Sequence, residues 1–328
     1  MILIKLGGSV LKDEGVLKAL SRELVQLQAA GISPIIVHGG GPAINEELKF
    51  RRIPWEFNQG LRITPKPMMD VIEMVLCGKI NRKLVRTLNA AGASAIGISG
   101  VDGNLLQCIP ADPHLGQVGQ IEQVNTQLLH LLLAPRSRHA PLMIPVIAPI
   151  GIDSEGNAFN INADWAASKI AQSMGIQQLI YITDQDGILD SEGRTIPQVD
   201  DQELHQLIEQ QTVHGGMLAK VRTILDALSN QVPEIHIVNA QRPQALKEAI
   251  FNQPGPRSFA GTTCQRRDEP KRSPNYDPTQ DQRSHHGRGA QPIRNPGFDP
   301  LCLGTQERPK GRPTPGIFAA KTAGTALR

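Results

Sequence analysis

Short apolar runs alternate with longer amphipathic stretches through the first three quarters of the chain. Residues 2–6 and 34–38 are apolar runs of the kind that form buried strands, and each is followed directly by glycines. Residues 16–30 carry leucines at helical spacing, and Gly31 ends that stretch. Pro42 suits the first turn of a second helix. The pattern therefore predicts a strand, a glycine-rich loop and a helix, used twice in succession.

The same alternation continues to about residue 251. Four more strands are predicted, at residues 95–98, 143–148, 178–183 and 234–238. Helices are predicted at residues 68–91, 125–133, 164–174, 200–210, 217–229 and 244–251, with hairpins in the glycine-punctuated stretch 105–124. Asp200 and Glu203 are spaced as a capping box for one of these helices. Strands that alternate with helices indicate an α/β fold, a three-layer αβα sandwich around a mostly parallel open sheet.

Composition changes this picture at the C-terminus. The 328 residues carry a net charge of +3, and aromatic side chains make up only 3%, so the core must be mainly aliphatic. Residues 254–328 hold eleven of the 25 prolines and thirteen Lys or Arg against six Asp or Glu. Such a composition buries too little apolar surface to offset the entropy of ordering. We expect this Pro/Arg-rich tail to be disordered, with out-of-frame readthrough as one hypothesis for it.

Partners and compartment follow from other features of the sequence. The tail is basic, but it has few aromatic side chains on which bases could stack, so no nucleic-acid partner is expected. No apolar run reaches the length of a signal-peptide core or of a membrane span, so no membrane partner is expected either. The four cysteines are widely spaced, which favours reduced thiols over a disulfide framework or a zinc site. The expected compartment is the cytoplasm.

Two glycine-rich loops are the first candidates for a binding site. Gly7 and Gly8 follow the first strand, and residues 39–41 follow the second. In an open parallel sheet such loops gather at the carboxyl ends of the strands, where N–H groups ahead of a helix suit phosphate or carboxylate. Glycines that merely form tight turns are the alternative. The chain lacks a P-loop motif, and its His-Gly-Gly-Gly segment lacks the nucleophile motif that an esterase would need.

Several charged residues stand where chemistry could use them. Lys5 is a lone charge in an apolar strand, so it must reach the mouth of a site or pair with a carboxylate. Asp164 falls in the first turn of a helix, where capping alone would explain it. Arg62 suits a substrate carboxylate, although loop arginines are commonly just solvated. Lys220, taken alone, is a surface lysine, and Asp184 could simply begin a turn.

Taken together, these segments resemble one family. They read Ile-Lys-Leu-Gly-Gly at residues 4–8, Val-His-Gly-Gly-Gly-Pro at 37–42, Gly-Leu-Arg-Ile-Thr at 60–64, Asn-Ile-Asn-Ala-Asp at 160–164, Thr-Asp-Gln-Asp-Gly-Ile-Leu at 183–189 and Gly-Gly-Met-Leu-Ala-Lys at 215–220. In this order they closely resemble the amino acid kinase family, and within it the acetylglutamate kinases, up to about residue 263. The resemblance implies an amino acid kinase-like fold at residues 1–263, which leaves the Pro/Arg-rich tail at residues 264–328, and it implies an enzyme of arginine biosynthesis. Its reaction would transfer the γ-phosphoryl group of ATP to the side-chain carboxylate of N-acetyl-L-glutamate, giving N-acetylglutamyl 5-phosphate.

The resemblance also implies catalytic roles. Lys5 and Lys220 match the family lysines that flank the transferred group, and Asp164 matches the residue that orients both. Gly8 matches a position that presents N–H groups to the same phosphoryl group. Because carboxylate and triphosphate are both anions, the in-line transfer needs cations around the moving group. Mg²⁺ is expected on the ATP phosphates, with no metal ligand from protein side chains.

The binding residues follow in the same way. Four positions match the contacts to acetylglutamate: Gly40, Gly41, Arg62 and Asn160, the last two on its α-carboxylate. Seven positions match the nucleotide side: Asp184, Asp186, Gly187, Ile188, Leu189, Gly216 and Met217. By the same resemblance, about residues 1–150 bind the acyl acceptor and form a dimer interface, and about residues 151–263 bind ATP.

Two other functions stay open. An N-acetyl-aminoadipate kinase of lysine biosynthesis would act on a substrate only one methylene longer, which a pocket discriminates modestly, although the loop at residues 60–64 favours acetylglutamate. A non-catalytic nucleotide-binding regulator would not require the intact Lys5, Lys220 and Asp164. Arginine-inhibited relatives carry an additional N-terminal helix that links dimers into hexamers, whereas the first strand here begins at residue 2. A homodimer insensitive to arginine is therefore expected.

Overall fold

The part of the chain that can be described covers most of the predicted domain. The computed structural model describes residues 1–135, 142–213, 215–230, 232–242, 244–251 and 258–261. These residues all belong to one compact unit, Met1–Arg267. The predicted tail at residues 264–328 lies outside the described residues. Within them, no helix combines the length and the apolar character that crossing a membrane requires.

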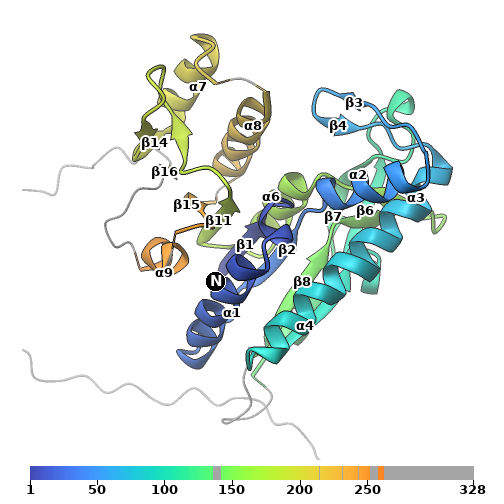
Figure 1. Ribbon diagram of the computed structural model, residues 1–328, viewed down its shortest axis with the longest axis horizontal. Helices are drawn as coiled ribbons and strands as arrows, with labels where there is room; N and C mark the ends of the chain where they lie inside the picture. Colours follow the sequence, from blue (N-terminus) through green and yellow to red (C-terminus); the bar gives the residue numbers. More distant parts are fainter. Residues whose placement is uncertain (136–141, 214, 231, 243, 252–257, 262–328) are drawn as a thin grey trace, which may run out of the picture. The chain divides into compact units, whose positions relative to one another are not determined.

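A large, mostly parallel sheet forms the centre of the described fold. Its strand order is β14 (Gln198–Asp200), β16 (Ser258–Gly261), β15 (Glu234–Asn239), β11 (Gln178–Thr183), β1 (Ile2–Leu6), β2 (Ile35–His38), β8 (Ile144–Ala148) and β5 (Ala95–Ser99) (Figure 1). The strands from β15 to β5 pair in parallel, and β16 pairs antiparallel with β15. The predicted mostly parallel sheet is confirmed. At one edge of the described sheet, β14 and β16 are parallel to each other and run opposite to the other strands.

Among the described residues, three smaller sheets lie near the carboxyl ends of these strands. One consists of β10 (Ala158–Asn160), β9 (Ile150–Ile152), β6 (Leu106–Pro110) and β7 (Gly119–Val124). Two others are the pairs β3 (Phe57–Asn58) with β4 (Leu61–Arg62), and β12 (Ile188–Leu189) with β13 (Thr195–Ile196). Strands β6 and β7 pair antiparallel, as expected of hairpins in this stretch.

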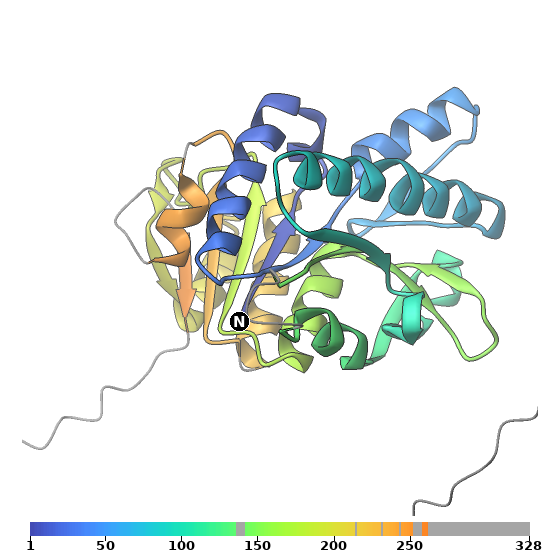
Figure 2. The ribbon, with the colours of Figure 1, turned by 90° about the horizontal axis from the view of Figure 1, so that it is seen from below.

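Helices cover both faces of the main sheet. One face carries α1 (Glu14–Ala29), α2 (Gly41–Phe50), α3 (Lys66–Glu73), α4 (Arg82–Ala90) and α9 (Ala245–Ile250). The other carries α5 (Gln127–Leu133), α6 (Ala163–Ser173), α7 (Asp201–Glu209) and α8 (Gly215–Ser229). Figure 2 shows α1 and α4 side by side over the first face. Short 3₁₀ turns lie at Val10–Lys12, Asp102–Asn104 and Pro113–Leu115. The three-layer αβα arrangement is therefore as predicted.

The helix predicted at residues 68–91 is not a regular α-helix along its whole length. Between α3 and α4 the backbone continues as a π-helix, η2 (Met74–Asn81). A π-helix has more residues per turn than an α-helix, and such turns within α-helices are frequent at functional sites. Here the wider turn buries Leu76, Ile80 and Asn81 on the side of the sheet. The hydrophobic pattern located the helix correctly but did not reveal this change of pitch.

Strand β1 shows how the layers position the first candidate residue. Side chains alternate along a strand, so Ile4 and Leu6 join the core beneath α1, whereas Leu3 joins the core beneath α6. Lys5 shares the face of Leu3 and therefore points toward α6. It lies at the carboxyl end of the central strand, between β2 and β11.

Candidate active site

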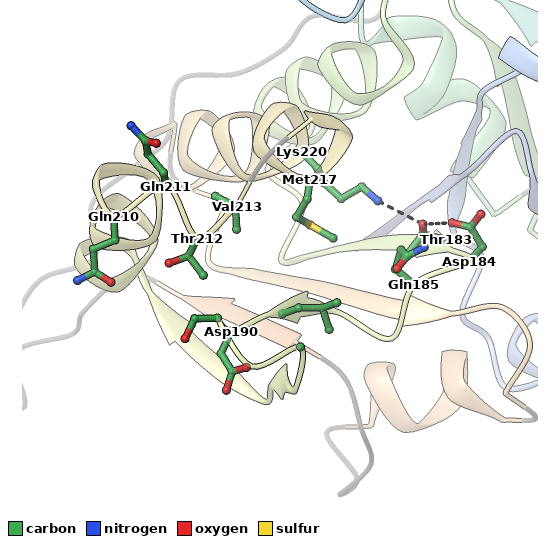
Figure 3. A pocket seen from close by; sticks show the side chains of 13 residues that line it. Thr183, Asp184, Gln185, Asp190, Gln210, Gln211, Thr212, Val213, Met217 and Lys220 are labelled. Carbon is green, nitrogen blue, oxygen red and sulfur yellow. Dashed lines mark hydrogen bonds between the residues drawn. The ribbon is translucent and has the colours of Figure 1, made fainter.

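Two pockets lie at the carboxyl ends of the central strands. The glycine-loop pocket, of about 230 Å³, is lined by Lys5, Gly8, Gly39, Gly40, Gly41, Arg62, Asn160 and Asp164, among others. The Thr183 pocket, of about 770 Å³, is lined by Thr183, Asp184, Leu189, Asp190, Gln210, Gln211, Thr212, Val213, Met217 and Lys220, among others (Figure 3). Most of the predicted site residues therefore fall into two neighbouring sets.

The two glycine loops are packed against each other. Gly39 N–H donates to the Leu6 carbonyl at 2.9 Å, which joins the ends of β1 and β2. A Cβ on Gly8 would lie 2.8 Å from Pro42 Cδ and 3.3 Å from the backbone nitrogens of Gly40 and Gly41. Only glycine lets the first loop come this close to the start of α2. Helix α2 has no side-chain cap, so its first N–H groups are left for a ligand with negative charge.

Lys5 and Asp164 form an ion pair at the bottom of the glycine-loop pocket. Lys5 Nζ lies 2.6 Å from Asp164 Oδ1, and the two side chains are 12% and 22% exposed. The cap of α6 is Asn162, whose Oδ1 accepts from the N–H groups of Asp164 and Trp165. Capping is therefore done by Asn162, and the Asp164 carboxylate is available to hold Lys5.

Lys220 reaches the same region from α8. Its Nζ donates to Thr183 Oγ1 at 3.2 Å, and Thr183 Oγ1 donates to Asp184 Oδ1 at 3.1 Å (Figure 3). Burial, together with the nearby charge of Lys5, lowers the pKa of Lys220, while Asp164 and Asp184 act in the opposite direction. The description of Lys220 as a surface lysine is therefore wrong. Two ammonium groups from distant parts of the chain are brought together between two carboxylates.

Arg62 is buried in the wall of the glycine-loop pocket and is only 6% exposed. Its Nη2 donates to Asn45 Oδ1, and its guanidinium lies 4.6 Å from the centre of the Phe57 ring. Burial lowers the pKa of Arg62 to about 10, so the group still carries its charge at neutral pH. Its Nη1 is buried and has no hydrogen-bond partner among the described residues. A buried cation with a free N–H face suits a carboxylate ligand.

Asn160 lies across the same pocket at the end of β10. Its Nδ2 donates to Thr64 Oγ1 at 3.2 Å, and Thr64 Oγ1 donates to the Arg62 carbonyl at 2.8 Å. The Thr64 hydroxyl thus ties Asn160 to the strand that carries Arg62. The two predicted carboxylate contacts are consequently held in one hydrogen-bonded unit.

Some of the predicted nucleotide-binding residues line the Thr183 pocket and others do not. Asp184, Leu189 and Met217 line the Thr183 pocket. Asp186 instead accepts from Asn239 Nδ2 at 2.9 Å, and Ile188 is fully buried. Gly187 has a φ of 150°, which favours glycine, and Gly216 lies in the first turn of α8. Asp184, Leu189 and Met217 therefore border the cavity, whereas Asp186 and Ile188 do not.

Sequence reasoning missed several residues of the site. Thr183 connects Lys220 with Asp184, and its position at the end of a strand was a usable signal. Asn45 orients Arg62, yet nothing in its sequence neighbourhood distinguishes it from other polar helix residues. Across the described ranges, His, Cys, Asp and Glu do not gather in any group of three or more that could hold a metal ion. Of the cysteines, Cys77 and Cys108 are free thiols, and Cys264 and Cys302 lie outside those ranges.

Comparison with known proteins shows the family to which the chain belongs. The sequence pattern of the Amino acid kinase family covers residues 1–239. An acetylglutamate kinase of Oleidesulfovibrio alaskensis is 39% identical over 266 residues, which is 77% of this chain and 88% of the relative. One from Campylobacter curvus is 40% identical over 256 residues, 78% of this chain and 89% of the relative. The crystal structure of smu.665 from Streptococcus mutans superimposes with a TM-score of 0.65 at 26% identity, covering 73% of this chain and 96% of that one. The chain belongs to the amino acid kinase family.

Proposed function

We propose that this protein is an acetylglutamate kinase, which phosphorylates the side-chain carboxylate of N-acetyl-L-glutamate with MgATP. The relatives that match most of the chain carry this name. The observation that carries the proposal is the buried Arg62, which lines a pocket that Lys5 also lines and whose Nη1 has no hydrogen-bond partner among the described residues. A small anionic acceptor fits these groups.

On the acceptor side, Arg62 and Asn160 bind the α-carboxylate of the substrate. Arg62 supplies the charge and a planar pair of donors, and Asn160, which lines the same pocket, supplies neutral polar contacts. The N–H groups of Gly40 and Gly41 bind polar atoms of the acceptor at the start of α2. Gly41 leaves open space where a Cβ would stand, which gives the ligand access to that backbone.

The transferred group lies between Lys5 and Lys220. The attacking carboxylate is already ionised, so the site has no need of a general base, and its main task is to offset the repulsion between two anions. The two ammonium groups provide this compensation, and Gly8 adds its N–H group. Asp164 acts as a positioning residue, because its 2.6 Å contact holds Lys5 at the pocket.

The nucleotide lies in the larger Thr183 pocket. Its volume, about 770 Å³, exceeds that of the glycine-loop pocket by about threefold and is of the size that binds drug-sized ligands. Mg²⁺ arrives as part of the substrate MgATP and neutralises phosphate charge. In this proposal about residues 1–150 serve the acceptor and about residues 151–263 serve ATP. The resemblance also supports a homodimer joined through the first half and acting in the cytoplasm.

The direct test measures ADP release by the purified full chain with MgATP and two acceptors, N-acetyl-L-glutamate and N-acetyl-L-2-aminoadipate. We expect a clearly higher kcat/KM for the first. Preference for the second acceptor would indicate a kinase of lysine biosynthesis. Turnover of neither acceptor, combined with ATP binding, would indicate a regulator without catalysis.

Arg62→Lys should raise the KM for acetylglutamate by about 10- to 100-fold, because a point charge replaces a planar donor that is held by Asn45. The KM for ATP should stay within about twofold. Arg51→Lys is the matched control, since Arg51 makes an exposed ion pair with Glu47. Equal effects of the two substitutions on the acceptor KM would contradict the role of Arg62.

A further inference from the structure

A buried asparagine lies behind the glycine-loop pocket, on the π-helix η2. Asn81 is 1% exposed, and its Nδ2 faces three acceptor atoms in three strands of the main sheet. These are the Val146 carbonyl at 2.9 Å, the Ile98 carbonyl at 3.3 Å and the Nε2 atom of His38 at 3.2 Å. The side chain thus connects β8, β5 and β2.

These partners determine where the proton of His38 resides. Carbonyl oxygens only accept, so the Asn81 atom that faces Val146 and Ile98 must be the donor nitrogen. The amide nitrogen carries two hydrogens and cannot accept a hydrogen bond, so the Nε2 atom that faces it must be the unprotonated nitrogen of His38. The imidazole is fully buried, and burial lowers its pKa to about 4, so it is neutral at physiological pH. The proton is therefore on Nδ1, which lies 3.0 Å from the Gly39 carbonyl oxygen and donates to it.

The Gly39 carbonyl is part of the peptide unit that carries the Gly40 N–H. Because a peptide unit is planar, holding the carbonyl in one direction also fixes the direction of that N–H. The amide of Gly39 is held as well, since its N–H donates to the Leu6 carbonyl at 2.9 Å. The loop between β2 and α2 is thus held on both sides of Gly39.

The π-helix also contacts the loop directly. A Cβ on Gly40 would lie 2.4 Å from Leu76 Cδ2 and 2.6 Å from Ile80 Cδ1, and both of these side chains belong to η2. The same helix therefore packs against Gly40 through Leu76 and Ile80 and also carries the Asn81 amide that faces His38. The wider turn of η2 presents these three side chains to one region of the sheet.

Asn81 destabilises the fold in a way that an apolar residue at the same position would not. Within the part of the chain that the structure describes, its Oδ1 is buried and has no hydrogen-bond partner. An unsatisfied buried oxygen is destabilising, and an apolar side chain of similar shape would remove that penalty. Moreover, a Cβ at Gly97 would meet Oδ1 at 2.0 Å, so the residue opposite is restricted to glycine.

We propose that Asn81 is a positioning residue for acceptor binding, which acts through the Nδ1–H tautomer of His38 to orient the Gly40 N–H into the glycine-loop pocket. The inference rests on the proposed function, in which Gly40 contacts the acceptor. Neither Asn81 nor His38 borders the pocket, so their influence on the substrate passes through the loop.

A spectroscopic measurement tests the tautomer without any assay of activity. The full chain contains nine histidines, so the ring nitrogen signals of His38 are assigned by their absence in His38→Asn. We expect ¹⁵N spectra of the wild type at pH 7 to show a neutral His38 ring with its proton on Nδ1. A neutral ring protonated on Nε2 would overturn the inference, whether or not the protein is an acetylglutamate kinase.

Steady-state kinetics test the effect on the loop, once turnover of acetylglutamate by the wild type has been established. Asn81→Ala should raise the KM for the acceptor by about tenfold or more and leave the KM for MgATP within about twofold, because a small misplacement of a binding group is costly. Asn89→Ala is the matched control. Asn89 lies on the adjoining α4 and bonds both the N–H and the carbonyl of Ala95, away from the pocket. An unchanged acceptor KM in folded Asn81→Ala, or an equal rise in Asn89→Ala, would refute the positioning role.

If Asn81→Ala does not fold, a pair of His38 variants tests whether the hydrogen bond to the Gly39 carbonyl orients the loop. His38→Asn places an amide donor near the position of Nδ1 and can still bind the Gly39 carbonyl, whereas His38→Leu offers no donor. We expect the acceptor KM of His38→Asn to stay within about threefold of the wild type, and that of His38→Leu to rise by about tenfold or more. Equal values for the two variants would show that the hydrogen bond to Gly39 does not orient the loop.

Discussion

Lys220→Met is expected to lower kcat by about 100- to 1,000-fold, because it removes one preorganised positive charge from a site where negative charge must be brought together. The melting temperature should change by only a few degrees. Burial and the charge of Lys5 already disfavour the ammonium form, as the lowered pKa of Lys220 indicates. A methionine of similar length can occupy the same space without that penalty. The measurement is kcat with saturating MgATP and acetylglutamate, together with thermal unfolding of both proteins.

The control for this prediction is Lys18→Met, which removes an exposed lysine from α1. It should leave kcat and both KM values unchanged. A decrease in kcat of less than tenfold in Lys220→Met would show that the transferred phosphoryl group does not lie beside the Lys220 ammonium. A loss of kcat that accompanied unfolding would instead indicate a structural role.

Asp164→Asn is expected to reduce kcat by about tenfold or more and to shift the alkaline limb of its pH profile to lower pH. Asp164 is one of two carboxylates that raise the pKa of Lys220 against burial and against Lys5. When its charge is removed, the pKa of Lys220 falls further. The catalytic form of the lysine is the protonated one, so activity is then lost at a lower pH. A neighbouring opposite charge favours the charged form of a lysine, so its removal moves the alkaline limb toward lower pH.

The profile of kcat between pH 6 and 10 checks this prediction, with Asp13→Asn as the control. Asp13 caps α1 by accepting from the Val16 N–H, and asparagine caps helices equally well. The alkaline limb of the kcat profile of Asp13→Asn should coincide with that of the wild type. An alkaline limb that stayed in place in Asp164→Asn would mean that it does not report a lysine coupled to Asp164.

Local signals in the sequence were sufficient for most of the elements. Strand β1 was predicted with its observed bounds, because an apolar run that ends in glycines has few alternatives. The capping box of Asp200 and Glu203 was also predicted correctly, since both of its hydrogen bonds depend on residues three positions apart. Interactions of this range can be recognised without knowledge of the fold.

Contacts between distant segments were beyond the reach of local reasoning. Nothing near Lys220 in the sequence indicates that its ammonium meets Thr183, and only the resemblance to a family suggested that it lies beside Lys5. The π-helix was missed for a related reason. Its apolar positions fit an α-helical pattern closely, and what distinguishes it is the buried position of Asn81 between three strands.

Strand β1 also imposes an order on folding. Its neighbour β2 is only about thirty residues away along the chain, whereas its other neighbour, β11, ends at Thr183. During synthesis the first residues can pair on one side almost at once, but the opposite edge of β1 stays open until more than half of the chain has been made. Pairing of such distant strands is slow, because a long loop must close before the contacts form. Asp164 lies on α6, just before β11 along the chain, so the ion pair between Lys5 and Asp164 also joins distant segments and forms late in synthesis.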